Sequence, residues 1–179
     1  MVSIIISIIY RVRRIMNKLA EIRSYNIEEF AVGFIIEKTQ DYIVSKQIGR
    51  YGQYDGYTFE SLKPISRIVY RSKYLDFMKK ILKNDNSNYA IVNKEDMILN
   101  ALKYNKLLTL SCKGWSIFIN VRVISFDNNI LKCQRINKYG EFKQDYNINV
   151  TSIDIMTFDS RLLRMYERII STKWKNWQK

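Results

Sequence analysis

Residues 117–136, IFINVRVISFDNNILKCQRI, decide the fold that the sequence predicts. From Ile117 to Ile124 side chains alternate between two faces, and one face is entirely aliphatic, which is typical of a β-strand. Asp127-Asn128-Asn129 supplies the polar residues of a tight turn, and Ile130–Ile136 is then expected to be the returning strand. The stretch therefore predicts an antiparallel hairpin.

Further elements are expected on both sides of this hairpin. A strand is predicted before it at Lys106–Cys112, and two more after it at Phe142–Val150 and Ile153–Phe158. A helix is expected from Ser160, and another begins after Asn93, a residue type that commonly caps helix N-termini. The second half of the chain is thus predicted to run helix, five strands, helix.

The first half repeats this plan at an offset of 88 residues. Residues 17–81 align with residues 105–169 without a gap and share 12 identities in 65 positions. Tyr51-Gly52 falls on Tyr139-Gly140, for example. A match this long without a gap indicates an internal duplication. The elements expected in the first half are strands at Leu19–Tyr25, Phe30–Lys38, Tyr42–Ile48, Tyr57–Leu62 and Ile65–Tyr70, and a helix from Ser72.

We therefore predict an α+β protein of two tandem copies. Each copy is a helix plus a five-stranded antiparallel small β-barrel, followed by a helix. The first repeat would take residues 1–85, with an N-terminal basic amphipathic helix, and the second residues 86–179, with the C-terminal helix. Each copy is close to the lower size at which a core is self-sufficient, so we expect the two to pack on each other.

A family resemblance rests on three segments of the second copy: the long strand at 117–124, the Asp127–Asn129 turn and the closing Ser-Ile-Asp-Ile-Met at 152–156. Together with the matching segment 66–69, they resemble the Sm-like small β-barrel, and the second copy is also similar to the barrel of WYL domains. The resemblance implies a fold only, because the Trp-Tyr-Leu tripeptide is absent and the Sm base-binding signatures are not clearly present. Sm-like barrels often join through strand edges, so a tandem pair could satisfy these edges internally or form oligomers through them.

The N-terminal segment is apolar but short. Ile5, Ile8, Val12 and Ile15 fall on one helical face, and most of the arginines fall elsewhere. We expect a helix that docks on the core, with binding to an anionic lipid surface as the alternative. The apolar run is too short to span a bilayer and lacks the features of a signal peptide, so we expect a cytoplasmic protein, with peripheral attachment to a membrane surface as the less favoured alternative.

The charge is strongly positive and evenly spread. The chain has 30 Lys and Arg against 17 Asp and Glu, a net charge of +13. Such an excess favours a polyanionic partner: nucleic acid, an acidic protein or an anionic membrane. The other interpretation is solubility combined with an AT-rich genome, which increases lysine content.

The sequence offers no catalytic set. The absence of histidine removes the commonest general base and metal ligand. Cys112 and Cys133 are expected to be buried small apolar residues, with a reactive thiol or a disulfide as alternatives. The glycines at 49, 52 and 56 lack the residues of a phosphate loop and fit a hairpin tip. We therefore expect no enzyme activity, cofactor or metal.

Two surfaces are candidates for contact with a partner. The first is the glycine-rich tip, whose aromatic and polar residues suit stacking on bases, a protein contact or simple packing. The second is the C-terminal helix, with a row of arginines on one face followed by an aromatic and basic run; its alternatives are a solvated face and packing on the barrel. The candidate residues are Arg50, Tyr51, Gln53, Tyr54 and Tyr57 at the tip, and Arg161, Arg164, Arg168, Lys173, Trp174, Lys175 and Trp177 at the C-terminus.

These observations favour a binding protein for RNA, another single-stranded nucleic acid or a ribonucleoprotein. The alternative is an inhibitor or adaptor that binds an acidic or nucleic-acid-binding protein. Small basic chains without catalytic residues are common among phage and mobile-element accessory proteins, so an anti-CRISPR-like, anti-defence role belongs to this alternative.

Overall fold

The computed structural model describes residues 18–25, 28–84 and 89–177, and residues 173–177 by their backbone alone. The predicted amphipathic helix near the N-terminus falls almost entirely outside these residues. In the described part of the chain, no helix is both long enough and apolar enough to cross a bilayer.

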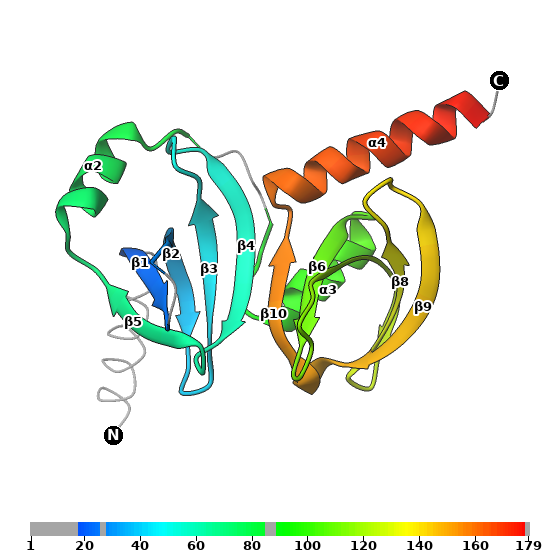
Figure 1. Ribbon diagram of the computed structural model, residues 1–179, viewed down its shortest axis with the longest axis horizontal. Helices are drawn as coiled ribbons and strands as arrows, with labels where there is room; N and C mark the ends of the chain where they lie inside the picture. The colour runs from blue at the N-terminus through cyan, green and yellow to red at the C-terminus, as the bar shows by residue number, and fades with distance from the viewer. Residues whose placement is uncertain (1–17, 26–27, 85–88, 178–179) are drawn as a thin grey trace, which may run out of the picture. The chain divides into compact units, whose positions relative to one another are not determined.

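The first half contains five strands and a helix (Figure 1). They are β1 (Lys18–Ser24), β2 (Phe30–Lys38), β3 (Tyr42–Ile48), β4 (Tyr54–Ser61), β5 (Ile65–Val69) and α2 (Lys73–Ile81). The predicted bounds of β2 and β3 are confirmed to the residue. Helix α2 begins after Ser72, whose hydroxyl accepts a hydrogen bond from the Leu75 amide. An N-cap of this kind satisfies a backbone donor that the first turn leaves without a helical partner.

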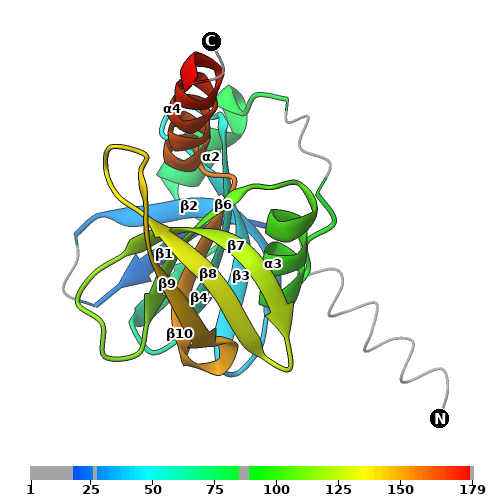
Figure 2. The same ribbon diagram turned by 90° about the vertical axis from the view of Figure 1, so that its right-hand side faces the viewer.

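The second half begins with a helix and then follows the same order. Its elements are α3 (Lys94–Lys103), β6 (Leu107–Cys112), β7 (Ile119–Asp127), β8 (Ile130–Ile136), β9 (Phe142–Asn149), the short 3₁₀ helix η1 (Val150–Ser152), β10 (Ile153–Phe158) and α4 (Arg161–Trp177). The bounds predicted for β8 and β10 are confirmed. The predicted turn between β7 and β8 is also confirmed, with Asn128 and Asn129 at φ 47° and 61°. Figure 2 shows β7, β8 and β9 curving side by side.

The strand registers of the two halves repeat at the 88-residue offset. Leu19 faces Phe34 in the β1–β2 pair, and Leu107 faces Arg122 in the β6–β7 pair. The β-bulge in β2, between Ile35 and Glu37, recurs in β7 between Val123 and Ser125. The five strands of each half also follow the same order, β5-β1-β2-β3-β4 in the first and β10-β6-β7-β8-β9 in the second.

The predicted fold class of two separate five-stranded barrels is wrong. The ten strands form one open antiparallel sheet in the order β5-β1-β2-β3-β4-β10-β6-β7-β8-β9. A closed barrel in the second half would need β9 to pair with β10. Instead, β10 pairs with β6 along one edge and with β4 along the other. Because both edges of β10 are occupied, that barrel cannot close.

The chain folds as two compact units that do not follow each other end to end. Of the described residues, the first unit takes those within 18–54 and 61–84. The second takes 55–60 and those from 89 onward, so the middle of β4 belongs with β10. The predicted domains are residues 1–85 and 86–179. They place residues 55–60 in the first domain, whereas the structure groups these residues with the second unit.

Each unit has its own apolar interior. In the first, Leu75 and Met78 of α2 are fully buried against Leu19 and Val32. A second buried cluster contains Ala20, Ile22, Ile35 and Ile43, with Ile65 and Ile68 of β5 packed against it.

In the second unit, α3 packs on β6, β7 and β10. Leu163 of α4 is buried with Leu107 and Ile136. Cys112 and Cys133 are both buried and free, as predicted for small core residues. Burial raises the pKa of the Cys133 thiol to about 12, so this side chain stays protonated near neutral pH.

Candidate functional site

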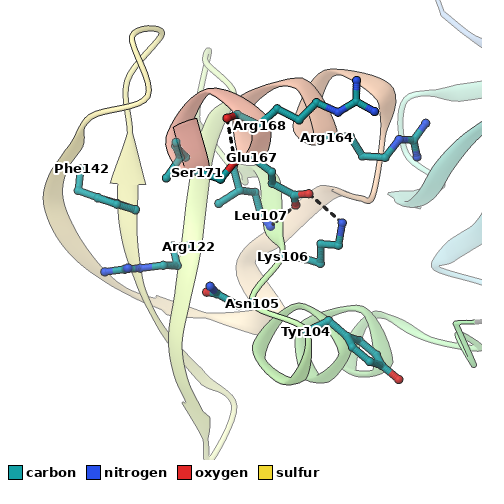
Figure 3. Close-up of a pocket in the computed structure, with 11 residues that line it drawn as sticks. Tyr104, Asn105, Lys106, Leu107, Arg122, Phe142, Arg164, Glu167, Arg168 and Ser171 are labelled. Carbon is teal, nitrogen blue, oxygen red and sulfur yellow. Dashed lines mark hydrogen bonds and ion pairs between the residues drawn. The ribbon is translucent and has the colours of Figure 1, made fainter. Parts of the chain in front are cut away.

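A cavity of about 760 Å³ lies in the second unit, lined by residues of α4, β7, β9 and the turn between α3 and β6 (Figure 3). The turn forms because Asn105 adopts a left-handed conformation, with φ at 49°. Asparagine tolerates this conformation better than most residues and often ends helices there. The Lys106 amide then bonds to the Ala101 carbonyl, and the chain enters β6 with Lys106 and Leu107 at the cavity.

One wall of the cavity is a stacked pair of side chains. The Arg122 guanidinium on β7 lies 4.1 Å from the centre of the Phe142 ring on β9. Its Nη2 donates to Gln134 Oε1 at 3.1 Å, which fixes the plane of the guanidinium. Cation–π contacts and a lateral hydrogen bond together hold an arginine flat. The wall therefore combines a positive charge with a planar surface.

The opposite wall is helix α4. This helix contributes five residues to the cavity lining: Arg164, Glu167, Arg168, Ile170 and Ser171. Figure 3 shows the Arg164 and Arg168 side chains extending the same way from the helix, on the other side of the cavity from Arg122 and Phe142. The cavity thus has cationic groups on two sides.

Two carboxylates neutralise part of this charge. Lys106 Nζ lies 2.8 Å from Glu167 Oε2 and 3.5 Å from Asp159 Oδ1. Burial lowers the pKa of Lys106, but the hydrogen bond that Lys106 donates to Glu167 and the charges of Glu167 and Asp159 outweigh burial and raise this pKa. Arg164 Nη1 lies 3.3 Å from Asp159 Oδ2. Lys106 and Arg164 are therefore held in place as structural ion pairs.

Arg122 and Arg168 differ from these two cations. Among the residues that the structure describes, no acidic side chain is ion-paired with either of them. Arg168 is exposed on α4. The lining therefore holds four cationic side chains and one carboxylate, and the two unpaired cations lie on opposite walls. Figure 3 shows their side chains extending away from each other, Arg122 toward the side of Phe142, so an anionic ligand at the cavity could contact either one.

The rim adds an aromatic group. The Tyr104 side chain, at the end of α3, is 46% exposed and lines the cavity. Its ring meets the Tyr89 ring edge-on at 5.5 Å, which limits its movement. An aromatic side chain held beside a cationic cavity can stack on a planar ligand. Within the described chain, no three Cys, Asp or Glu side chains come together as metal ligands.

The predicted site residues fall in different places. Arg164 and Arg168 line the cavity, whereas Arg161 does not. The Arg161 amide instead donates to Asp55 Oδ1 at 2.7 Å. The side chains of Lys173, Trp174, Lys175 and Trp177 lie outside the described part of the chain, although their backbone continues α4.

The glycine-rich tip is divided between the two units. Tyr51 is 64% exposed and Arg50 is exposed, while Gln53 bonds the Tyr51 amide and stabilises the turn. The Tyr54 ring lies beneath Lys46 Nζ at 5.3 Å. Tyr57 belongs to the second unit and is only 4% exposed, so it is a core residue there.

Sequence reasoning missed most of the cavity, including Arg122, Phe142 and Tyr104. The repeat contained a signal, because Arg122 falls on Phe34 of the first half. Phe34 packs against the buried cluster of the first unit. A core aromatic residue in one copy and an arginine in the other indicates that the second copy has a different use for the position.

The comparisons with known proteins add no relative. No protein-family model, no curated protein and no solved structure matches the chain.

Proposed function

We propose that the protein binds single-stranded nucleic acid, with RNA as the first candidate, at the cavity between α4 and the β7–β9 wall. The observation that carries the proposal is the pair of unpaired arginines on opposite walls, one of them stacked flat on Phe142. A chain with a net charge of +13 also attracts polyanions over long range.

The cavity favours single strands over duplexes. A single strand can turn a base out of its stack, and proteins receive such bases between aromatic rings and arginine planes. Tyr104 at the rim and the Arg122–Phe142 pair offer surfaces of both kinds. Arg168 can contact a neighbouring phosphate, because phosphate groups pair readily with exposed arginines. Bases in a duplex are stacked and paired, so entering the cavity would cost the energy of unstacking and unpairing them.

The proposed activity is binding without catalysis. The two carboxylates near the cavity, Glu167 and Asp159, are engaged with Lys106 and Arg164. Glu167 also accepts the Leu107 amide at 3.0 Å, so both of its oxygens have partners. These groups support the geometry of the site by fixing β6 to α4.

Fluorescence anisotropy with labelled RNA, single-stranded DNA and duplex DNA of mixed sequence tests the proposal. The Arg122→Ala/Arg168→Ala double variant should bind single strands about tenfold or more weakly, because two phosphate or stacking contacts are lost. The slope of log affinity against log salt should also become shallower by roughly 0.7, since Arg168 is the proposed phosphate contact and single strands contribute about 0.7 per phosphate.

The internal repeat supplies a matched control. Lys80 lies at the position of the first half that corresponds to Arg168, is exposed and carries the same charge. Lys80→Ala should leave affinity nearly unchanged. Equal losses in the two variants would overturn the site, and binding that does not depend on salt would overturn the function. Capture of a host protein that survives nuclease treatment, combined with no binding to any oligonucleotide, would favour the inhibitor alternative.

A further inference from the structure

The pairing of β4 with β10 depends on four residues of one short segment, which we call the docking segment, Asp55–Phe59. In this antiparallel pair Tyr57 faces Phe158 and Phe59 faces Met156. The side chains of Tyr57 and Phe59 are 4% and 3% exposed. Burying two aromatic residues contributes favourably to this pairing.

The first two residues of the docking segment fit the end of β10. Asp55 Oδ1 accepts the Arg161 amide at 2.7 Å, so a carboxylate lies at the N-terminus of α4. Negative groups are favoured there because helix N-termini carry partial positive charge. Gly56 has φ at +88°, and a Cβ on it would lie 2.4 Å from the Phe158 carbonyl oxygen and 2.7 Å from the Ser160 amide nitrogen. Only glycine permits this approach.

The repeat identifies a second edge where the same pairing could occur between molecules. In the described chain, β5 and β9 end the sheet and have a neighbour on one side only. Shifted by 88 residues, β9 is the counterpart of β4, and β5 is the counterpart of β10. If the internal pairing were repeated between two copies, β9 of one would lie against β5 of the next, and the head-to-tail series could continue.

The β9 edge has none of the four docking residues. The counterparts of Asp55, Gly56, Tyr57 and Phe59 are Lys143, Gln144, Asp145 and Asn147, and all four are exposed. Lys143 would bring a positive charge to the N-terminus of α2. Gln144 has a Cβ, and a Cβ at the equivalent position of β4, Gly56, would clash with the backbone at the end of β10. Asp145 and Asn147 would bury polar groups at the positions where the β4–β10 pair buries the rings of Tyr57 and Phe59.

We propose that the docking segment selects the β10 edge, and that Lys143, Gln144, Asp145 and Asn147 close the β9 edge to a second copy of this chain. The strand pairing then occurs once, within each molecule. The β4 and β10 edges are then satisfied within the molecule, and the pairing does not continue from β9 of one copy to β5 of another.

The test is to transfer the docking segment to β9. The variant K143D/Q144G/D145Y/N147F gives β9 the four residues of β4 and changes only exposed positions. Sedimentation velocity of the full-length protein should show a single species for the wild type across a hundredfold range of concentration. The variant should show a mass that rises with concentration.

A control variant isolates the glycine. K143D/D145Y/N147F keeps Gln144 and should remain a single species. Three results would overturn the proposal: association of the wild type that is abolished by a charge substitution on β5, such as Arg67→Glu; a four-residue variant that stays monomeric; or equal association of the control. Circular dichroism of each variant confirms that the fold is retained, so a negative result remains informative.

Discussion

Single residues decide how the two copies of this repeat differ. At one position the first copy has the half-buried Phe34 packed against its core, and the second has Arg122 at its cavity. At another, Gly56 allows the backbone of β4 to approach β10, and its counterpart Gln144 does not. Both differences replace a residue suited to close packing with a polar one. The structural divergence of the copies can therefore be followed residue by residue.

Gly56→Ala should destabilise the protein much more than Gly114→Ala. Both glycines have positive φ, at +88° and +79°, but a Cβ on Gly114 meets nothing within 4 Å. Gly114→Ala should cost only the conformational term, about 1 kcal/mol. Gly56→Ala adds a backbone clash and should cost roughly 1–3 kcal/mol more. Urea unfolding followed by circular dichroism measures both. Equal losses would mean that β4 can retreat from β10 without penalty.

The secondary structure was largely predictable because its signals are local. The two-residue period from Ile130 to Ile136 and the asparagines before it specify a strand and a turn without any distant contact. The sequence pattern predicts a start of β7 at Ile117, two residues too early, because the alternation of side chains extends into the preceding loop. In the structure Ile117 and Phe118 are exposed, at 52% and 60%. Periodicity cannot distinguish a strand from an apolar loop that precedes it.

The helix caps differ between the copies in a way that can be measured. Ser72 and Ser160 are repeat counterparts, and the hydroxyl of each accepts an amide hydrogen bond at the start of a helix, from Leu75 and Leu163. Ser72 also donates to Glu21, a carboxylate that is 1% exposed. Removing that donor leaves a buried charge with one partner fewer.

Ser160→Ala should therefore cost about 1 kcal/mol, the usual value of an N-cap. Ser72→Ala should cost roughly 1.5–3 kcal/mol more, because a hydrogen bond to a buried charged group is also lost. Thermal and urea unfolding of the two variants give the difference. If Ser72→Ala/Glu21→Gln is no more stable than Ser72→Ala, the buried charge is not the cause.

At the scale of the whole molecule, the sequence predicted the repeat and missed the connection between its copies. The fold of each half depends on nearby residues, whereas the pairing of β4 with β10 joins segments almost a hundred positions apart. The cavity was missed for the same reason. Arg122, Phe142 and Tyr104 come from three elements, and only the tertiary structure brings them to one place. Arg164 and Arg168 were predicted because a helix places them on one face.

A fragment of residues 86–179 should be much less stable than the intact protein. It lacks residues 55–60, which belong to its unit, and with them the buried rings of Tyr57 and Phe59. At about 1.5–3 kcal/mol for each buried ring, the loss approaches the total stability of a small domain.

A synthetic peptide of residues 53–62 should restore cooperative thermal unfolding to this fragment, because it refills the β10 edge. The same peptide with Phe59→Ala should do so poorly. Cooperative unfolding of the fragment alone, at the temperature of the intact protein, would contradict the assignment of this segment to the second unit.

The position of residues 55–60 in the chain has a consequence for synthesis. These residues leave the ribosome 93 positions before β10 begins at Ile153. At roughly 5–20 residues per second, β4 therefore waits about 5–20 s with an unpaired edge. During that interval Asp55 reduces the risk of aggregation, since a charge on an unpaired edge disfavours pairing with other nascent chains. One of the residues that later fit β10 thus also protects the growing polypeptide before its partner exists.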